Sequence, residues 1–280
     1  MTDYDSQAEL SRSRRRFIAG MGVAGIVTGA NLLVGCGGSS NSNASSNQDV
    51  QILSAAATAE ALATVMYDNI IKSTLYTSGI GTNANDQAYL VAGREQEAIH
   101  YATLTAAGGT ALALTFYFPV GMFSTAHGTQ NVQTTVNTLI TLEDAFIAAY
   151  LIAINEFSQT SSKVLAGQIL GVESEHRALG RVIASDLGLS TVTGLSGSPE
   201  SVQSPQHAVN NIAYERTFAT TGPQLQTIND VVKLLGPFVT APTAGAAGAF
   251  DPTPYSFNTT SNYYLTETPT VTLDVTTPVS

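Results

Sequence analysis

The chain has 280 residues, of which 44% are hydrophobic and 11% are charged, so it can bury a large core. Its formal net charge of −10 argues against nucleic acid as a partner, because phosphate backbones bind positively charged surfaces. Cys36 is its one cysteine, which excludes an internal disulfide.

The N-terminal residues 1–35 have the pattern of an export signal. Consecutive arginines at 14–16 precede an apolar run, 17–35, that is rich in Gly and Ala and ends next to Cys36. The pattern resembles a twin-arginine signal followed by a bacterial lipoprotein box. A transmembrane anchor over 17–35 is the alternative, but the Gly content, Thr28 and Asn31 make it a weak span. We therefore expect cleavage before Cys36, lipidation of that residue, and a lipid-held protein on the periplasmic side of a bacterial membrane.

After this signal, residues 36–48 are rich in Gly, Ser and Asn, which predicts a flexible tether. Four segments then have the length, composition and apolar spacing of helices. They cover residues 49–78, 85–107, 130–159 and 161–187. The expected fold is therefore all-α, with a four-helix bundle over 49–187.

The connection between the second and third of these helices is long and includes the β-prone residues 112–118. Antiparallel neighbours need only a short link, so the second and third helices should run parallel, with one long crossover between them. An extension over 188–239 should contain a fifth helix at about 222–238. Residues 240–280 are expected to form an extended or disordered tail, in which 270–279 alternates weakly like a short strand.

Two of the four histidines follow a glutamate by three residues, as Glu97 with His100 and Glu173 with His176. Residues three apart in a helix share one face, so each pair can point at a common ion. The helix before each pair adds one glutamate in an apolar stripe, Glu60 or Glu143. Burying an unpaired carboxylate is costly, and metal coordination would offset that cost. For Glu143 the alternative is a buried salt bridge, and for Glu60 it is an exposed acid.

A weak internal repeat supports this reading. Tyr67 follows Glu60 by seven residues, and Tyr150 follows Glu143 by seven. Both tyrosines lie on the ligand stripe, where either core packing or a contact with a ligand side chain is expected. Asp144 is a further residue that could orient a ligand. His127 and His207 fall in loop-like segments and are not expected to take part.

These residues resemble the ferritin-like superfamily, in particular bacterial ferritin-like domain proteins related to plant desiccation-related proteins. The matching stretches are 94–100, 142–150 and 172–176. The resemblance implies a ferritin-like bundle and carries over all six ligand positions: Glu60, Glu97, His100, Glu143, Glu173 and His176.

A site of four carboxylates and two imidazoles suits two Fe or two Mn ions, with Glu97 and Glu173 bridging and Glu60 and Glu143 terminal. Such a site could act on dioxygen, peroxide or Fe(II), which predicts a ferroxidase or a peroxide-consuming oxidoreductase. Two alternatives stay open. One is a manganese catalase-like activity, and the other is a non-enzymatic envelope protein of stress or desiccation whose metal is structural or sequestered.

Overall fold

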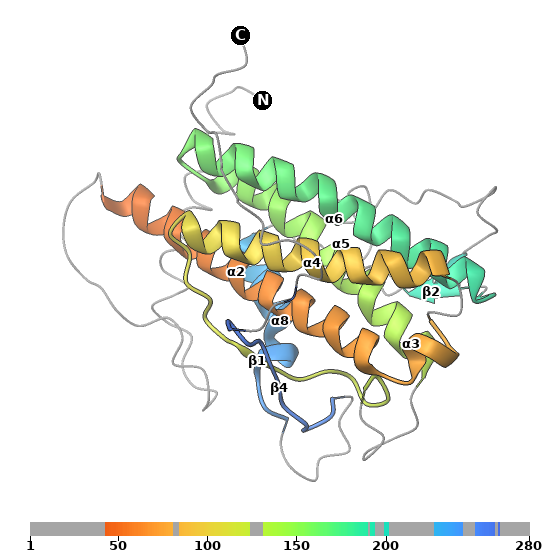
Figure 1. Cartoon of the computed structure of the whole chain (residues 1–280). Helices are drawn as coiled ribbons and strands as arrows, with labels where there is room; N and C mark the ends of the chain where they lie inside the picture. The colour runs from red at the N-terminus through yellow and green to blue at the C-terminus, as the bar shows by residue number, and fades with distance from the viewer. Residues whose placement is uncertain are drawn as a thin grey trace. The chain divides into compact units, whose positions relative to one another are not determined.

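The computed structural model describes residues 43–80, 84–123, 131–189, 191–193, 199–201, 227–242, 250–260 and 263. The expected signal with Cys36, most of the tether and residues 270–279 lie outside them. Long helices dominate the described part of the chain (Figure 1). They are α2 (Asn43–Lys72), α4 (Ala84–Ala106), α5 (Val132–Glu156) and α6 (Thr160–Asp186).

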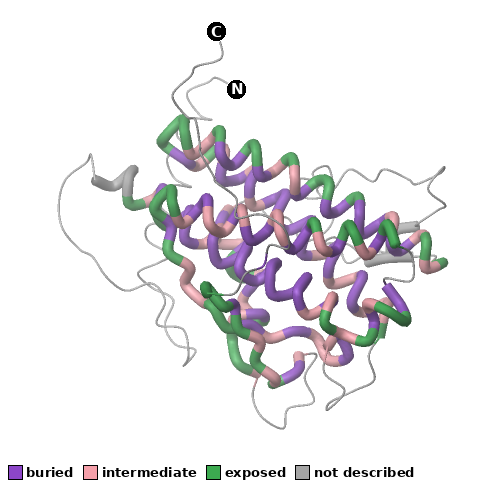
Figure 2. The backbone as a smooth tube through the Cα atoms, viewed as in Figure 1, coloured by how far each residue is buried: buried purple, intermediate pink, exposed green. Residues whose placement is uncertain are grey.

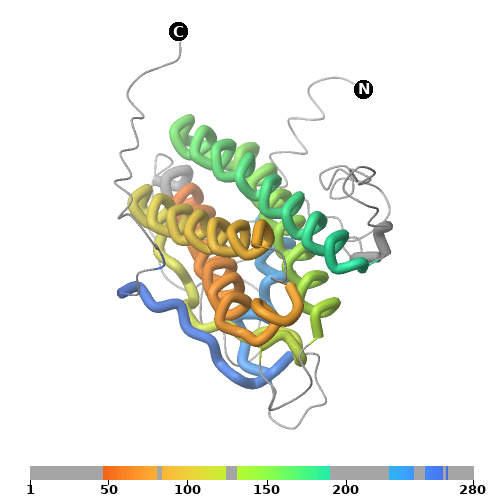
Figure 3. The backbone as a smooth tube through the Cα atoms, turned by 45° about the vertical axis from the view of Figure 1, so that its right-hand side comes forward, coloured from red at the N-terminus to blue at the C-terminus, as the bar shows by residue number. Residues whose placement is uncertain are grey.

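These helices form two antiparallel hairpins, α2 with α4 and α5 with α6, which pack against each other in two views of the backbone (Figures 1 and 3). The first helix begins earlier than expected and ends at Lys72. A short helix, α3 (Leu75–Ser78), covers the rest of the expected segment 49–78. The side chain of Asn131 accepts a hydrogen bond from the backbone N–H of Thr134 and so caps the start of α5.

The directions of the helices follow from three contacts at their ends. A Cβ atom on Gly79, just before α4, would lie 3.0 Å from Cγ2 of Val132, the first residue of α5. At the opposite end, a Cβ atom on Gly109 would lie 2.7 Å from the carbonyl oxygen of Leu53. The carboxylate of Asp49 accepts a hydrogen bond from the backbone N–H of Ser158 there, at 2.8 Å. Helices α4 and α5 therefore run parallel, which confirms the predicted long crossover.

The crossover passes along α2 and is held by C-terminal segments. Its strand β1 (Thr115–Phe116) pairs antiparallel with β4 (Tyr255–Ser256), as Figure 1 shows. Helix α8 (Ile228–Val239) confirms the predicted fifth helix, and its Phe238 carbonyl accepts a hydrogen bond from Tyr117 N. Strands β2 (Thr191–Thr193) and β3 (Pro199–Ser201) form a second antiparallel pair. Within the expected tail, residues 250–257 are extended and bonded to the crossover.

Buried residues concentrate where the helices face one another, and exposed residues lie along their outer edges (Figure 2). Helices α2 and α5 are apolar and long enough to cross a membrane by composition alone, but 78% and 67% of their most apolar windows are buried in the bundle. Their apolar composition is therefore explained by the core, which surrounds a group of charged side chains.

Candidate metal centre

Six ionisable side chains from the four long helices meet inside this core. Helix α2 contributes Glu60, α4 contributes Glu97 and His100, α5 contributes Glu143, and α6 contributes Glu173 and His176. The four carboxylate residues are 0% exposed. The structure thus brings together every residue that the spacing analysis selected.

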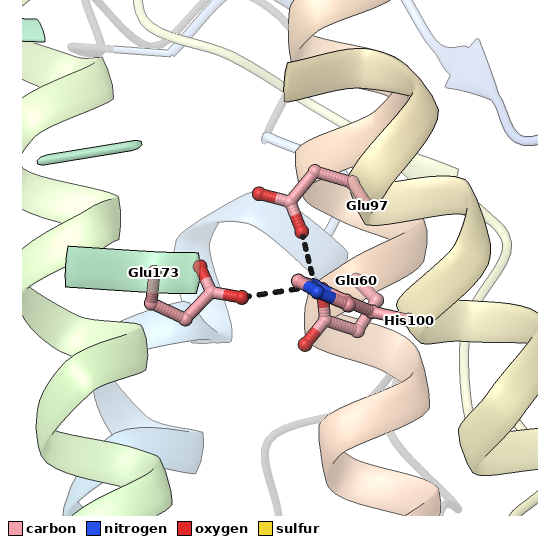
Figure 4. A group of neighbouring side chains, drawn as sticks. All are labelled: Glu60, Glu97, His100 and Glu173. Carbon is pink, nitrogen blue, oxygen red and sulfur yellow. Dashed lines mark hydrogen bonds and ion pairs between the residues drawn. The ribbon is translucent and has the colours of Figure 1, made fainter. Parts of the chain in front are cut away.

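The first half of the cluster surrounds His100. Its Nδ1 atom lies 3.3 Å from Oε2 of Glu60, 3.3 Å from Oε2 of Glu97 and 3.1 Å from Oε1 of Glu173. Figure 4 shows these side chains converging, with Glu173 reaching across from the opposite hairpin. The hairpins therefore present their carboxylates at one level.

The second half surrounds His176. Its Nδ1 atom lies 3.0 Å from Oε1 of Glu97, 3.7 Å from Oε2 of Glu173 and 3.9 Å from Oε2 of Glu143. Glu97 and Glu173 thus turn one oxygen toward each histidine. Glu60 contributes to the first half and Glu143 to the second. Each half offers four ligand atoms within 4.8 Å of one another, and the two halves share Glu97 and Glu173.

Apart from the ion-pair contacts with the histidine nitrogens given above, several buried polar atoms of the cluster have no hydrogen-bond partner within the described structure. They are Oε1 of Glu97, Oε2 of Glu143, both oxygens of Glu173 and Nδ1 of His176. Buried carboxylate oxygens without donors are costly, and a divalent cation would satisfy them. The donor set of oxygens and imidazole nitrogens fits such cations, so the residues present can hold metal.

Proton affinities in the cluster reflect the crowding of like charges. Burial raises the pKa of Glu60 well above its ordinary value, and Glu173 and Glu97 raise it further. The pKa of Glu143 is raised by burial and by Glu97. Burial raises the pKa of Glu97, but the charge of His176 together with hydrogen bonds from Glu60, His100 and His176 outweighs it, so the pKa is lowered. Without a metal ion, the terminal carboxylates therefore hold their protons to higher pH than ordinary glutamates do.

The two imidazoles also hold their protons to higher pH than an ordinary histidine does. Burial alone lowers the pKa of His100, but Glu60 and the other carboxylates raise it well above its ordinary value. The pKa of His176 is likewise raised against burial, mainly by Glu97. Binding of a cation would have to displace these protons, so it is a proton-releasing process.

Each terminal carboxylate accepts a hydrogen bond from a tyrosine of the opposite hairpin. The hydroxyl of Tyr67, on α2, donates to Oε1 of Glu143 at 2.7 Å. The hydroxyl of Tyr150, on α5, donates to Oε1 of Glu60. Both tyrosines are buried, and burial raises the pKa of each phenol, further raised by the acceptor carboxylate. Of the two expectations for these tyrosines, the structure therefore supports contact with a ligand side chain over core packing alone.

Asp144 follows Glu143 in α5, is buried, and forms an ion pair of 2.6 Å with Nε of Arg177. Arg94 lies 3.4 Å from the carboxylate of Asp68.

The sequence analysis did not identify Gln96. Its Oε1 atom lies 2.8 Å from Nε2 of His176. The apolar spacing of the helix does not single out Gln96, because this polar residue is only half-buried. A hydrogen bond to the outer nitrogen of a ligand histidine is nevertheless the usual way to fix such a ring.

The fold and the cluster together define a helical bundle with carboxylate and histidine groups that could hold metal ions. Residues 48–185 match the family model described as ferritin-like domain, so this segment is similar to that family. Among curated proteins, none matches the chain.

Proposed function

We propose that this protein binds two Fe or two Mn ions between its hairpins, bridged by Glu97 and Glu173. The observation that carries the proposal is the overlap of the two four-residue groups in those two carboxylates. Glu60 and His100 complete one ion's ligands, and Glu143 and His176 complete the other's. All six ligand positions come from this chain.

The chemistry of the donors supports Fe or Mn over thiolate-bound metals. Cys36 is the chain's one cysteine and lies far from the cluster in sequence. Four carboxylates balance the charge of two divalent cations, and oxygen-rich sites favour Fe and Mn. When bound, two such metal ions could exchange electrons with a substrate, which suits oxidation of Fe(II) by dioxygen or consumption of peroxide.

The protein's own residues would prepare the site for that chemistry. The hydroxyls of Tyr67 and Tyr150 each hold one oxygen of a terminal carboxylate, and the second oxygen of each faces a histidine of the cluster. The 0% exposure of the carboxylates excludes bulk water from between the ligands. We therefore favour a ferroxidase or peroxide-consuming oxidoreductase.

Metal analysis tests the binding step. The purified protein should contain close to two Fe or Mn ions per chain, and a Glu97→Ala, Glu173→Ala double variant should lose both. Glu175→Ala is the matched control, because Glu175 is exposed on α6 two residues from Glu173. Far fewer than two ions in the unmodified protein, after incubation with excess Fe(II) or Mn(II), would refute the proposal.

Complete burial of the carboxylates also favours a second function, a non-enzymatic stress or desiccation-related protein whose metal braces the bundle or is sequestered. Turnover assays separate the possibilities. Fe(II) oxidation supports a ferroxidase, and peroxide dismutation that requires Mn supports a manganese catalase-like enzyme. A protein that loses thermal stability on chelation, with no turnover of Fe(II) or peroxide, supports the structural role.

We further propose that the protein is exported by the twin-arginine route and held at the periplasmic side of a membrane by a lipid on Cys36. The support is the sequence pattern of residues 14–36. Cys36→Ala should move the protein from the membrane fraction to the soluble periplasmic fraction. Substitution of Arg15 and Arg16 by Lys should retain it in the cytoplasm. Unchanged fractionation of both variants would contradict the assignment.

A further inference from the structure

The two histidines of the cluster differ in how their outer nitrogens are held. Nε2 of His176 lies 2.8 Å from the amide oxygen of Gln96, on α4. An amide oxygen only accepts, so Nε2 is the ring nitrogen that donates to Gln96, and once Nδ1 gives up its proton to metal binding its lone pair is left for the ion. That lone pair faces Glu97, Glu173 and Glu143. His176 is thus set in the tautomer that a metal ion requires.

Among the described residues, none gives His100 an equivalent support. Its Nδ1 faces the carboxylates in the same way, but no described residue accepts a hydrogen bond from its Nε2. The sequence gives the reason. Gln96 directly precedes Glu97, and the corresponding position before Glu173 is Val172, whose side chain can neither accept nor donate.

Ring packing adds to the difference. The ring of His176 lies edge-on to Tyr67, with centroids 5.8 Å apart. Tyr67 is in turn backed by Gly93, where a Cβ atom would lie 3.0 Å from its Cε1. The side chain of His100 is 8% exposed and that of His176 is 3% exposed. His176 is therefore the more constrained ring.

We infer that the two ion positions are unequal, and that Gln96 is the positioning residue that makes the His176 position the tighter one. This inference rests on the proposed dinuclear site. The His176 position holds a resident ion, with Glu143 as its terminal ligand. The His100 position, with Glu60, takes the second divalent cation and releases it first.

Mn(II) titration of the metal-free full chain, followed by calorimetry and by the EPR signal of free Mn(II), tests the inference. Two binding steps at least about tenfold apart are expected. Gln96→Leu should weaken the tighter step by about 10- to 100-fold and leave the weaker step in place. Gln96→Glu keeps an acceptor oxygen and should retain the tighter step. Gln168→Leu, at an exposed position of α6, is the matched control and should change neither step.

His100→Ala and His176→Ala assign the steps. The first should abolish the weaker step alone, and the second should abolish the tighter one. Thermal unfolding of the metal-free variants shows that each one folds. A variant that fails to fold would lose both binding steps. Loss of the tighter step alone in Gln96→Leu, with that step kept in Gln96→Glu, is specific to the contact between residue 96 and His176.

Two equal steps in the unmodified protein, or an unchanged tighter step in Gln96→Leu, would overturn the inference while the dinuclear site stands. An unmodified protein that binds no Mn(II) and no Fe(II) would overturn the proposed function itself, and this inference with it.

Discussion

The terminal carboxylates Glu60 and Glu143 each receive a phenol hydrogen bond from the partner hairpin. The exchange is reciprocal, because Tyr67 and Glu60 share α2 while Tyr150 and Glu143 share α5. Each bond therefore joins the two hairpins at the centre of the core. A carboxylate held in this way keeps one oxygen fixed and points the other into the cluster.

Replacing Tyr67 by Phe should loosen Glu143 without changing the shape of the core. Mn(II) affinity of the position that Glu143 serves should fall by about 10- to 100-fold, as expected for loss of a residue that orients a ligand. Calorimetric titration measures the change. Tyr89→Phe is the control, because Tyr89 is 50% exposed on α4. Equal affinities in both variants would show that the Tyr67 bond has no part in binding.

At the scale of the elements, Gly109 decides how the chain leaves α4. A Cβ atom there would lie 2.7 Å from the carbonyl oxygen of Leu53 and 3.0 Å from that of Leu104. Backbone atoms cannot move aside as a flexible side chain can. The close approach lets the crossover continue along α2, where Thr110 N and Leu112 N donate to hydroxyls of Ser54 and Thr58.

Gly109→Ala should therefore destabilise the protein by about 1–3 kcal/mol, the range for overpacking. Gly171→Ala is the contrasting variant, since Gly171 lies in α6 with nothing within 4 Å of its added Cβ. It should stabilise the protein by up to about 1 kcal/mol, because Ala favours helix more than Gly does. Urea unfolding measures both, and an unchanged midpoint for Gly109→Ala would contradict the packing argument.

The crossover depends equally on the C-terminal segments. Phe118 is 1% exposed, and its ring contacts those of Phe238 on α8 and Tyr255 on β4. The backbone adds a hydrogen bond from Asp251 N to the carbonyl of Phe118. Residues beyond the ferritin-like segment therefore complete the cover of the bundle.

Phe118→Ala should cost about 3–5 kcal/mol of folding free energy, the usual range for a buried aromatic ring. Leu114→Ala, in the same connection but 36% exposed, should cost much less. Thermal or urea unfolding tests the pair. Similar losses in the two variants would mean that the contact between crossover and α8 adds little stability.

At the scale of the whole molecule, the ionisable cluster couples folding to pH and metal. The pKa values of Glu60 and Glu143 are raised in the folded state, so the metal-free fold binds more protons than the unfolded chain. The stability of the metal-free fold then falls as pH rises above about 4.3, the ordinary pKa of a Glu side chain. The raised pKa values of His100 and His176 act in the same direction, from about pH 6.5 upward. The lowered pKa of Glu97 opposes this only in acid, where its stabilising contribution is lost as pH falls.

The metal-free protein should consequently melt at a lower temperature near pH 7.5 than near pH 5.5, where these groups hold more of their protons. Mn(II) should reverse the trend, because a cation competes with the protons and binds best once they are gone. Differential scanning calorimetry with and without a chelator measures both. A stabilisation by Mn(II) that is no larger at the higher pH would contradict the linkage between metal and protons.

Local sequence was sufficient for the helices, the crossover and the six clustered side chains. Helical periodicity and the three-residue spacing of Glu and His depend on residues near each other in the chain, and parallel helices need a long link whatever its path. Asn131 and the break after Lys72 are local features that only shifted helix ends. The expected binding of metal by the cluster remains a prediction that the titrations test.

Contacts across the bundle required the tertiary structure. The partners Tyr67 with Glu143 and Gln96 with His176 are separated by 76 and 80 residues, and no periodic pattern pairs them. No periodic pattern pairs β1 with β4 or packs Phe118 against α8 either. A helical face shows which side chains point inward, but the depth and rotation of packed helices decide which atoms meet. The sequence by itself therefore determined the set of inward-pointing groups, and the packing decided the hydrogen bonds that make the two halves of the cluster unequal.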